Sequence, residues 1–400
     1  MVGGAVRDEL LGLPIKDRDW VVVGATPAEM LAQGYTQVGQ DFPVFLHPET
    51  KEEYALARTE RKTDAGYTGF EVHAAPDVTL EQDLKRRDLT INAMALTLDG
   101  QLIDPLNGKQ DLQQRLLRHV SPAFVEDPVR LLRVARFATR LAPLNFTIAS
   151  ETQALLQQIV TAGEVDALVP ERVWGEIERA LNEPHPSIFF TTLRECGALA
   201  RILPEVDALF GVPQPEKHHP EIDTGIHTMM VLDCAAKLSA DPEVRFAALC
   251  HDLGKGNTPR EKWPSHHGHE MRGVALLLKL CQRMRVPKHF RELALLVSRY
   301  HTHCHRAAEL RPETLLKTVE SLDAFRRPER FAQFLLACEA DSRGRSGYEA
   351  SDYPQASRFQ LAYQAASAVD VRQLVEQGHH GKALAGEIHA ARIHAIKAIA

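Results

Sequence analysis

The sequence predicts an α+β fold, in which a small α/β head with a mixed sheet precedes an all-helical body. Two observations support this prediction. Short β-branched runs bounded by turn residues are confined to residues 1–110. From residue 111 onward, apolar residues recur at helical spacing, with one Pro- and Gly-containing break at 211–223. A chain of 400 residues is too long for a single core, so we expect several domains.

The predicted elements follow in order along the chain. Strands are expected at 20–23, 53–58 and 68–72. A helix is expected from residue 111, because Leu112, Leu116 and Val120 recur at helical spacing, and another begins after Asp127-Pro128. We therefore divide the chain into a head (1–110), a helical neck (111–210), a linker (211–223), a second helical domain (224–325) and a helical tail (326–400).

Composition narrows the class of protein. Hydrophobic residues make up 44% and charged residues 25%, which is typical of a soluble globular chain. No apolar run approaches the roughly 18–20 residues of a membrane span, and charged residues stand near the N-terminus where a signal peptide would be apolar. The six cysteines include no Cys-x-x-Cys pair, which indicates thiols in a reducing compartment. We therefore expect a cytoplasmic protein that does not bind a membrane.

A glycine pair and two carboxylates near the N-terminus predict a phosphate-binding metal site. Asp17 and Asp19 stand at i and i+2, so on a strand they would point to the same side. Two such acids can bind Mg²⁺ while substrate phosphates and water complete the octahedron. The Gly3-Gly4 pair would let the backbone approach a phosphate. Each motif alone is common in surface turns, and their close succession favours the functional interpretation.

Clustered arginines are candidate partners for phosphates and bases. Arg86 and Arg87 place two cations beside an acid, which suits a triphosphate or a nucleic-acid backbone. A second group follows at helical spacing: Asp127, Arg130, Arg133 and Arg136. A carboxylate and a guanidinium on one helical side can read the edge of a base. For each run taken alone, the alternative is a solvated polar face.

As an ordered set, these motifs resemble those of the class II CCA-adding enzymes, the tRNA nucleotidyltransferases. The motifs are Gly3-Gly4-x-x-Arg7-Asp8, Asp17-x-Asp19, Arg86-Arg87-Asp88-x-Thr90-x-Asn92-Ala93, Glu126-Asp127-x-x-Arg130 and Pro170-Glu171-Arg172-x-Trp174-x-Glu176. Among these enzymes, the chain looks similar to the bacterial type with a C-terminal HD domain. The resemblance implies a nucleotidyltransferase head that adds C, C and A to the 3′ end of tRNA from CTP and ATP, without a nucleic-acid template.

The resemblance also implies roles for individual residues. Asp17 and Asp19 would hold the catalytic Mg²⁺, with Glu60 as a further carboxylate near the metals. Residues 63–69 would form the flexible loop associated with the switch to A. The nucleotide would be bound by Gly4, Arg7, Arg87, Asp127, Arg130, Arg133 and Arg136, of which Asp127 and Arg130 would select C or A.

One feature departs from the family pattern. The family has a short apolar strand before the glycine pair, whereas only Met1 and Val2 precede Gly3 in this sequence. We expect that a few apolar residues upstream would raise both the melting temperature and the turnover. Equal values with and without such residues would contradict this expectation.

Histidines concentrate between residues 218 and 305, where 11 of the 19 lie, mostly in the second helical domain. His227 and the adjacent His251-Asp252 pair are the main candidates for metal ligands, because a buried pair of this kind is costly without a cation. Further candidates are His269, His301 and Asp341. Any one of these histidines taken alone is as readily a surface or core residue.

This second pattern resembles the HD phosphohydrolase superfamily. The resemblance implies a divalent transition metal, with Ni²⁺ as one candidate, held by His227, His251, Asp252 and Asp341. His269 and His301 would serve a second metal or the substrate. In CCA enzymes of this type, such a domain acts as a phosphatase, a 2′-nucleotidase and a 2′,3′-cyclic phosphodiesterase.

Two alternative functions remain open at this point. A bacterial poly(A) polymerase shares the head motifs, but those enzymes tend to have a basic tail and no HD motifs. The other alternative is an HD phosphohydrolase whose head only binds RNA. The net charge of −6 does not exclude an RNA partner, because residues 271–300 contain seven basic residues against the single acid Glu292. The expected partners are tRNA, ATP and CTP, and the protein is expected to be a monomer or a homodimer.

Overall fold

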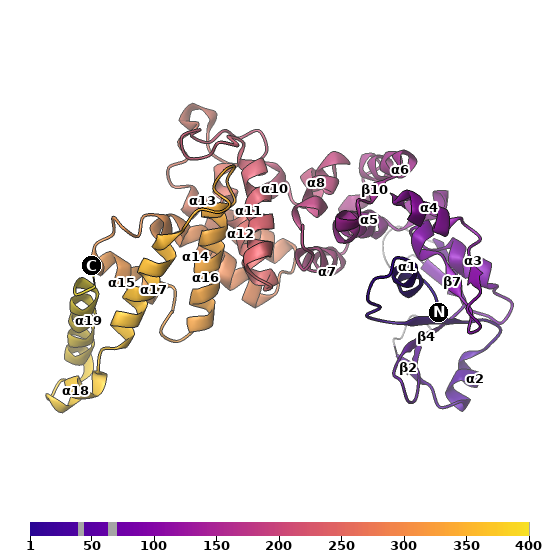
Figure 1. The fold of residues 1–400 in the computed structure, drawn as a ribbon, viewed down its shortest axis with the longest axis horizontal. Coiled ribbons are helices and arrows are strands. Elements are labelled where there is room, and N and C mark those ends of the chain that lie inside the picture. The colour runs from indigo at the N-terminus through magenta and orange to yellow at the C-terminus, as the bar shows by residue number, and fades with distance from the viewer. Residues whose placement is uncertain (39–43, 63–69, 400) are drawn as a thin grey trace. The chain divides into compact units, whose positions relative to one another are not determined.

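The computed structural model describes residues 1–38, 44–62 and 70–399, which form two compact units (Figure 1). Unit 1 contains residues Met1–Ala180 and Ile188–Ile202, and unit 2 contains residues Leu181–Ser187 and Leu203–Ala400. Unit 1 combines strands with helices, whereas the secondary structure of the described part of unit 2 is helical apart from one isolated bridge. The predicted α+β fold with a helical body is therefore confirmed. The expected loop at 63–69 lies outside the described residues.

The main sheet of unit 1 has the strand order β1-β4-β3-β2. β1 (Asp19–Val22) is parallel to β4 (Glu53–Leu56), and β3 (Val44–Leu46) is antiparallel to both β4 and β2 (Thr36–Val38). The remaining strands form two-stranded pairs: β5 (Thr59–Lys62) with β6 (Phe70–His73), β7 (Ala95–Leu96) with β8 (Leu102–Ile103), and β9 (Leu116–Leu117) with β10 (Thr147–Ile148).

Val2 joins β1 to the β7–β8 pair. It forms one isolated bridge with Asp19 and another with Ala95, and its side chain is buried. The amino group of Met1 donates a hydrogen bond to the carbonyl oxygen of Leu96 at 2.9 Å. A single residue therefore lies where the family pattern has a short strand before the glycine pair.

The first 202 residues also form the helices of the head and the neck. They are α1 (Gly4–Leu10), α2 (Pro27–Ala32), α3 (Leu80–Lys85), α4 (Gly108–Gln114), α5 (Val129–Leu141), α6 (Ser150–Thr161), α7 (Pro170–Leu181), α8 (Ser187–Glu195) and α9 (Ala198–Ile202). The central helix α5 begins directly after Pro128, as predicted, and buries an apolar face that includes Leu131 and Leu132. This packing holds the arginines of α5 in fixed directions.

The expectation of a helix that continues through Val120 is wrong. α4 ends at Gln114, because Arg115 adopts a left-handed backbone conformation with φ of 58°. Leu116 and Leu117 then form β9, which pairs in parallel with β10. Leu117 is fully buried in this strand, so an apolar side chain at this position is explained by a strand as well as by a helix. Pairing with a segment distant in sequence decides the conformation, and helical spacing cannot reveal it.

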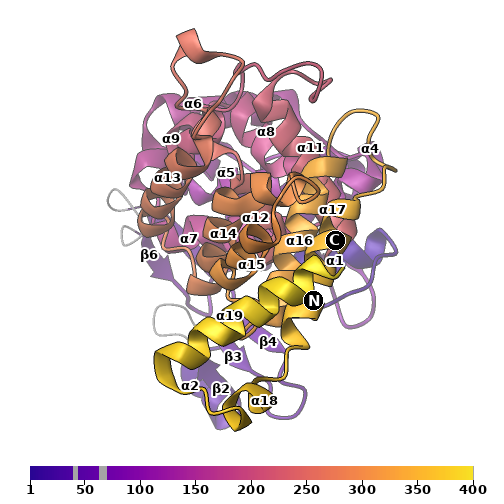
Figure 2. The ribbon, with the colours of Figure 1, turned by 90° about the vertical axis from the view of Figure 1, so that its left-hand side faces the viewer.

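Unit 2 is built around a group of packed helices. Its helices are α10 (Pro204–Asp207), α11 (Thr224–Leu238), α12 (Pro242–Cys250), α13 (His269–Arg283), α14 (Lys288–His305), α15 (Pro312–Ser321), α16 (Pro328–Arg343), α17 (Pro354–Ser367), α18 (Val371–Glu376) and α19 (Gly381–Lys397). Helix α12 packs against α11, α14 and α16, as the views in Figures 1 and 2 show. Phe246, Phe290 and Phe334 are buried in the core of this unit.

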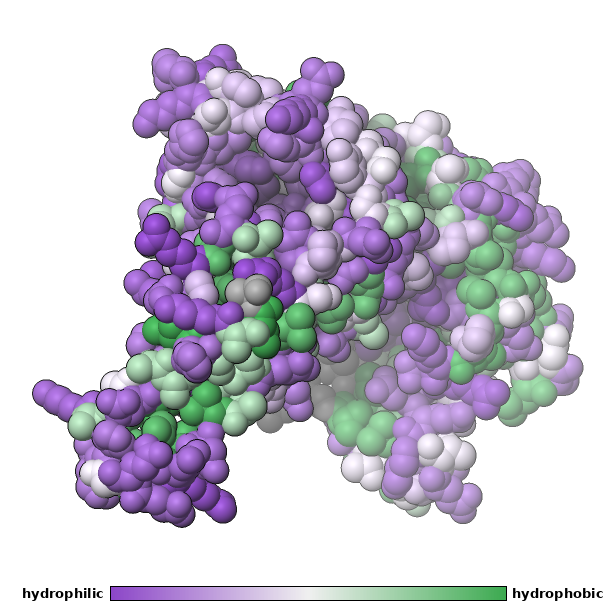
Figure 3. All heavy atoms as spheres, turned by 60° about the vertical axis from the view of Figure 1, so that its left-hand side comes forward, coloured by the Kyte–Doolittle hydropathy of each residue, from purple (hydrophilic) through white to green (hydrophobic). Residues whose placement is uncertain are grey.

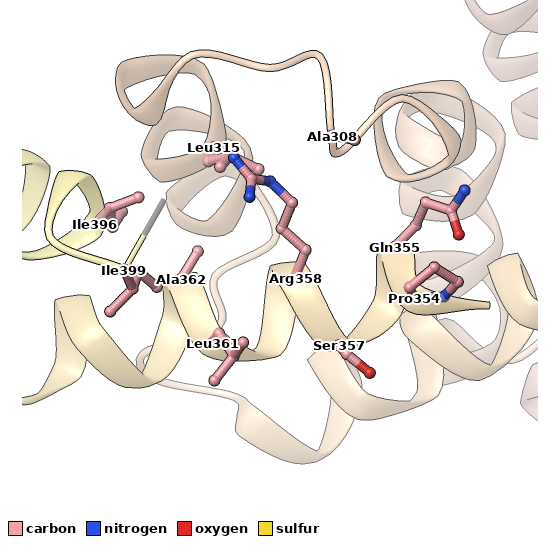
Figure 4. A pocket seen from close by; sticks show the side chains of 10 residues that line it. All are labelled: Ala308, Leu315, Pro354, Gln355, Ser357, Arg358, Leu361, Ala362, Ile396 and Ile399. Carbon is pink, nitrogen blue, oxygen red and sulfur yellow. The ribbon is translucent and has the colours of Figure 1, made fainter. Parts of the chain in front are cut away.

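The C-terminal helices enclose an apolar pocket of about 390 Å³ (Figure 4). Leu315 and Ile396 are buried in its lining, whereas Leu361 and Ile399 are largely exposed. Arg358 also lines it, and the Nε atom of this residue donates to the carbonyl oxygen of Ala307 at 2.9 Å. Figure 3 shows apolar residues gathered on the face that carries these helices. Among the described residues, no helix combines the length and the apolar character that a membrane span requires.

Candidate functional sites

The two carboxylates of the head lie at the beginning of the main sheet. β1 begins at Asp19, which pairs with Glu53, so the expectation that Asp17 also belongs to the strand is wrong. The pKa of Asp19 is raised because the surrounding protein reduces its hydration, while the charge of Arg87 opposes this effect and that of Asp17 adds to it. Both side chains remain accessible to solvent. Two coupled, accessible acids suit a hydrated cation such as Mg²⁺.

The glycine pair lies against one of the predicted arginines. Gly3 has a φ of +71°, and a Cβ atom at this position would come within 2.7 Å of Nη1 of Arg87. Glycine is therefore required both for the turn and for the close approach of the guanidinium. Gly4 follows as the first residue of α1. The structure thus brings Arg87 next to the turn, and its charge acts on Asp19.

Arg7 lies in the interior of unit 1. It is 1% exposed, its Nη1 atom donates to Oδ1 of Asn92 at 2.7 Å, and its Nε atom donates to Asp8 at 2.8 Å. Asp8 also pairs with Arg140 at 2.8 Å. In this geometry Arg7 is part of a buried ionic network that links α1 to α5 and orients Asn92.

The arginines of α5 have different partners. Arg133 pairs with the buried carboxylate of Asp88 at 2.7 Å. Arg136 pairs with Glu176 on α7 at 2.5 Å, and both residues are buried. The pKa of Asp88 is well below its usual range, because Arg133 and hydrogen bonds from neighbouring groups outweigh the effect of burial. The arginines of α5 therefore do not all face one surface: Arg136 faces the interior, where it pairs with Glu176.

The acid–arginine pair at the start of α5 lies close to the arginine pair of the head. Arg130 donates to the carbonyl oxygen of Arg86 at 2.6 Å, and Asp127 pairs with Arg172 at 3.1 Å. Asp127 and Arg130 are half-buried, so part of each side chain remains available to a ligand. Glu60 lies on β5, and its side chain is outside the described part of the chain.

Unit 2 brings together all six residues that the histidine-rich pattern predicts. They form two groups, in each of which the ligand atoms lie within 4.8 Å of one another: His227, His251 and Asp341, and Asp252, His269 and His301. The residues come from α11, α13, α14, α16 and the turn after α12. The sequence predicted His227, His251, Asp252 and Asp341 as one set, with His269 and His301 as further candidates. In the structure Asp252 is grouped with those two histidines, and its Oδ2 atom also lies 3.1 Å from Nε2 of His251.

The hydrogen-bond partners of the imidazoles determine which nitrogen faces each group. Three Nδ1 atoms lie next to main-chain carbonyl oxygens: His251 at 2.7 Å from Ala248, His269 at 3.0 Å from His266, and His301 at 2.9 Å from Val297. A carbonyl oxygen only accepts, so each of these Nδ1 atoms carries a proton and each Nε2 atom faces the group of candidate ligands. The Nε2 atoms of His269 and His301 lie 3.2 Å apart, and both are close to Oδ1 of Asp252, at 3.2 and 3.6 Å.

The acidic members of the groups are buried and negatively charged. Asp341 lies 3.0 Å from Nε2 of His227, and Asp252 lies 3.2 Å from Nε2 of His269. Burial acts to raise the pKa of both carboxyls, but His251 and other cationic neighbours hold each pKa well below its usual range. The same two carboxylates outweigh burial and raise the pKa of His251 to about 10.

These residues fit a divalent cation. Nε2 of His251 and Oδ1 of Asp252 are buried and have no hydrogen bond within the described part of the chain. Buried carboxylates need compensating positive charge, and nitrogen and oxygen ligands of this kind suit several divalent transition metals. A bound metal ion would take the place of the proton on His251.

Several supporting residues were not predicted from the sequence. Glu221, from the segment expected to be a linker, lies 2.8 Å from Nδ1 of His227. His305 contacts Oδ2 of Asp341 at 2.7 Å, and Tyr353 contacts Nδ1 of His305 at 2.9 Å. Lys255 contacts Asp252 at 2.6 Å. Lys255 was visible in the Gly-Lys-Gly run after His251-Asp252, whereas the other three gave no signal in the sequence.

Fold and sites together define the class: a metal-dependent nucleotidyltransferase head joined to an HD-type metal centre. Residues 1–118 match the poly(A) polymerase head domain, residues 145–210 match the probable RNA and SrmB-binding site of polymerase A, and residues 224–327 match the HD domain. The matches are separate in sequence and together cover most of the chain.

Relatives identify the family. The chain is 65% identical to the multifunctional CCA protein of Thioalkalivibrio sulfidiphilus and 66% identical to that of Nitrosococcus oceani, in both cases over 99% of this chain and 97% of the relative. The chain therefore belongs to the multifunctional CCA proteins, which are tRNA nucleotidyltransferases with an HD domain.

Solved structures show the same fold. A CCA-adding enzyme in apo form II has a TM-score of 0.67 at 20% identity, over 100% of this chain and 90% of that one. The Thermotoga maritima CCA-adding enzyme, complexed with tRNA, has a TM-score of 0.64 at 19% identity, over 98% of this chain and 85% of that one.

Proposed function

We propose that the head extends the 3′ end of tRNA by C, C and A from CTP and ATP, without a nucleic-acid template and with release of pyrophosphate. Asp17 and Asp19 would hold Mg²⁺, which would stabilise charge on the transferred phosphoryl group. Asp19 would help remove the proton of the tRNA 3′ hydroxyl. Glu60 remains a candidate for a further carboxylate at this site.

The observation that carries this proposal is the grouping of Gly3, Asp19 and Arg87 around one turn. A guanidinium beside a glycine turn and next to paired acids suits a metal-bound triphosphate. Gly4, Arg7, Arg133 and Arg136 are proposed as further nucleotide-site residues. For Arg7 and Arg136, whose guanidiniums are buried in ion pairs, the proposed contribution is to hold the site in shape.

Base selection is proposed for Asp127 and Arg130. An acid and an arginine together offer acceptors and donors to the Watson–Crick edge of either C or A. In the structure described above, Asp127 is paired with Arg172, so a base would have to compete with that arginine. The family assignment favours CCA addition over poly(A) synthesis as the activity of this head.

Incubation with tRNA that lacks CCA, together with labelled CTP and ATP, tests the head. We expect three added residues, after which extension stops. An open-ended A tail would support the poly(A) polymerase alternative. The double variant Asp17→Ala/Asp19→Ala should incorporate no nucleotide, and no incorporation by the unaltered protein would support a head that only binds RNA.

We also propose that the HD centre removes phosphate groups from RNA ends and nucleotides, with 2′-nucleotidase and 2′,3′-cyclic phosphodiesterase activity. His227, His251 and Asp341 would hold one divalent ion, and Asp252, His269 and His301 a second. Such ions would supply Lewis-acid activation of water and phosphate. Ni²⁺ is a candidate because imidazole-rich sites suit it.

The grouping of Asp252, His269 and His301, whose ligand atoms lie within 4.8 Å of one another, supports the proposal of a second ion, because a buried carboxylate beside two imidazole nitrogens is a suitable ligand set for a divalent cation. To test it, His251→Ala and His269→Ala are assayed for hydrolysis of 2′,3′-cyclic AMP and for bound metal per chain. We expect both variants to lose hydrolysis and to retain CCA addition. Loss of both activities would contradict two separate sites.

The remaining assignments are proposals of the same standing. Residues 1–110 would be the catalytic head and 111–210 the neck that selects nucleotides and binds tRNA, followed by the linker 211–223, the HD domain 224–325 and the helical tail 326–400. A tRNA-processing enzyme of this kind would act in the cytoplasm, as a monomer or a homodimer. Size-exclusion chromatography with light scattering distinguishes these two states.

A further inference from the structure

We propose that Asp83 is the residue that positions Arg87 for the nucleotide and sets the cation affinity of the head. Asp83 lies on α3, three residues before the Arg86-Arg87-Asp88 motif and outside the motifs that resemble those of the family. The inference rests on the proposed nucleotide site of the head. It concerns a residue that would touch neither the nucleotide nor the metal.

The carboxylate of Asp83 is fully buried and holds two arginines at once. Its Oδ1 atom accepts from Nε and Nη2 of Arg86 at 2.9 and 2.8 Å, and its Oδ2 atom accepts from Nη2 of Arg87 at 3.1 Å. A buried carboxylate with two guanidinium partners is a rigid acceptor, since neither oxygen can leave without exposing an unpaired charge. The pKa of Asp83 is accordingly lowered in spite of its burial.

Asp83 also connects these arginines to the rest of the site. Its Oδ1 atom accepts from the main-chain N–H of Arg58 at 3.3 Å, between β4 and β5. Since β4 pairs with β1, this contact ties the carboxylate to the strand that begins at Asp19. The carbonyl oxygen of Arg86 in turn accepts from Arg130 at 2.6 Å. One buried acid thus fixes α3 against both the sheet edge and the proposed base-selecting arginine.

The consequence for Arg87 is geometric. Its Nη1 atom lies 2.7 Å from the position that a Cβ on Gly3 would take and 3.5 Å from the carbonyl oxygen of Asn92, and its other nitrogens are held by Asp83. Without that acceptor, the side chain would be free to turn away from the glycine turn, and its alignment with a phosphate would be lost.

The consequence for the cation is electrostatic. Asp83 offsets part of the positive charge of Arg86 and Arg87, and Arg87 acts directly on Asp19. Replacing the carboxylate by an amide removes the negative charge that offsets these arginines, so the charge of Arg87 acts on Asp19 with less compensation. This charge opposes the binding of a divalent cation.

The test compares Asp83→Asn with a matched control, Asp111→Asn. Asp111 is a similarly buried carboxylate in unit 1 that accepts from Arg118 at 3.0 Å and from Thr90 at 2.6 Å, away from Arg87. Two equilibrium measurements without tRNA or turnover are made on the full chain: Mn²⁺ binding by electron paramagnetic resonance, and CTP binding by calorimetry. We expect Asp83→Asn to weaken both by about tenfold, the lower range for outer partners of metal sites, and Asp111→Asn to change neither.

A second variant distinguishes the effect of the negative charge at residue 83 from the effect of its position. It also provides a test if Asp83→Asn does not fold. Asp83→Glu keeps the charge but displaces it by one methylene, so it should retain Mn²⁺ affinity and weaken CTP binding. Equal CTP and Mn²⁺ affinities in all three variants and the unaltered chain would overturn the proposal, as would identical losses in Asp83→Glu and Asp83→Asn. If the unaltered protein bound CTP but added no CCA, the proposed function would fail while this inference would stand.

Discussion

Nε2 of His227 on α11 lies 3.0 Å from Oδ1 of Asp341 on α16, although the two residues are 114 positions apart in the sequence. The contact joins the first and last of the candidate HD ligands, and His251 lies 3.5 Å from the same oxygen. Each of the three side chains is at least nine-tenths buried. The HD centre is therefore a closed cluster held by the helical core, and its properties depend on that core.

Replacement of Asp341 should abolish the response of unit 2 to metal. In Asp341→Asn the amide preserves the shape but removes the negative charge that faces His227 and His251. The melting temperature of the unaltered protein should rise when Ni²⁺ or Mn²⁺ is added, by an amount equivalent to about 2.7 kcal/mol at one hundred times the Kd. The variant should show no rise. Glu339→Gln on the same helix, which pairs with Arg343, should behave like the unaltered protein, and a normal response in Asp341→Asn would refute its role.

Replacement of Tyr353 should change the affinity of the HD centre for metal, although the Tyr353 hydroxyl contacts His305 and not a candidate metal ligand. Its hydroxyl contacts Nδ1 of His305, whose Nε2 atom contacts Asp341. Tyr353→Phe removes one contact from this chain, so Asp341 is held less firmly, and we expect metal affinity to fall by about tenfold. Calorimetric titration with Mn²⁺ measures this. The control is Tyr363→Phe on α17, the helix that begins directly after Tyr353; the ring of Tyr363 packs on Phe331. Equal metal affinities in the two variants would show that Tyr353 does not influence the centre.

The pair of Asp88 and Arg133 should make unit 1 sensitive to acid. The pKa of Asp88 is lowered in the folded state, so its stabilisation is present above its unfolded value of about 4 and is lost as the pH falls through the folded value. Asp88→Asn should cost about 2 kcal/mol at pH 7, because it leaves a partly buried Arg133 unpaired. The difference between variant and unaltered protein should shrink steadily below pH 4.

Urea unfolding of both proteins between pH 7 and pH 2.5 measures that difference. The exposed acid Asp77 provides the control, since Asp77→Asn should change stability by less than about 0.5 kcal/mol at any of these pH values. A difference that is independent of pH would show that Asp88 stabilises the protein through its shape alone.

Gly254 should tolerate no side chain. A Cβ atom there would overlap the carbonyl oxygen of His269 and approach the main-chain nitrogen of Gly273, because the turn after His251-Asp252 is pressed against the start of α13. Since both neighbours are backbone, we expect Gly254→Ala to destabilise unit 2 by about 3 kcal/mol and to separate the two metal groups. Gly386→Ala on α19 meets nothing within 4 Å and should be neutral or stabilising. Thermal unfolding and the amount of bound metal per chain are measured for both variants. Equal unfolding midpoints for Gly254→Ala and Gly386→Ala would disprove the steric argument.

Much of the fold could be predicted from local sequence patterns. The predictions that failed concern segments whose conformation depends on pairing with a distant part of the chain. The start of α5 after Pro128 follows from the sequence, because proline and the apolar repeat act locally. The helix expected across Leu116 and Val120 fails, since β9 exists only through its pairing with Thr147–Ile148. The beginning of β1 at Asp19 likewise depends on its partner Glu53.

The candidate sites show the same division. Residues that carry chemistry, such as His251 and Asp252, stand in short motifs and could be found from the sequence. Glu221, His305 and Tyr353 could not, because none of them stands in a motif and each is recognised only by its contact with another residue of the centre: His227, Asp341 and His305, respectively. The internal pairing of Arg136 with Glu176 was also hidden, since both residues lie in polar runs that resemble solvated faces.

The distribution of the HD residues over the chain has a consequence for biosynthesis. Chains emerge from the ribosome N-terminus first and tend to fold domain by domain. The glycine turn and the carboxylates of the head are synthesised within the first 20 residues, but the cluster in unit 2 lacks Asp341 until α16 has been translated. A nascent chain that ends at α14 therefore carries histidines without their closing carboxylate. We therefore expect metal binding by this cluster to be a late step, after most of the polypeptide has left the ribosome.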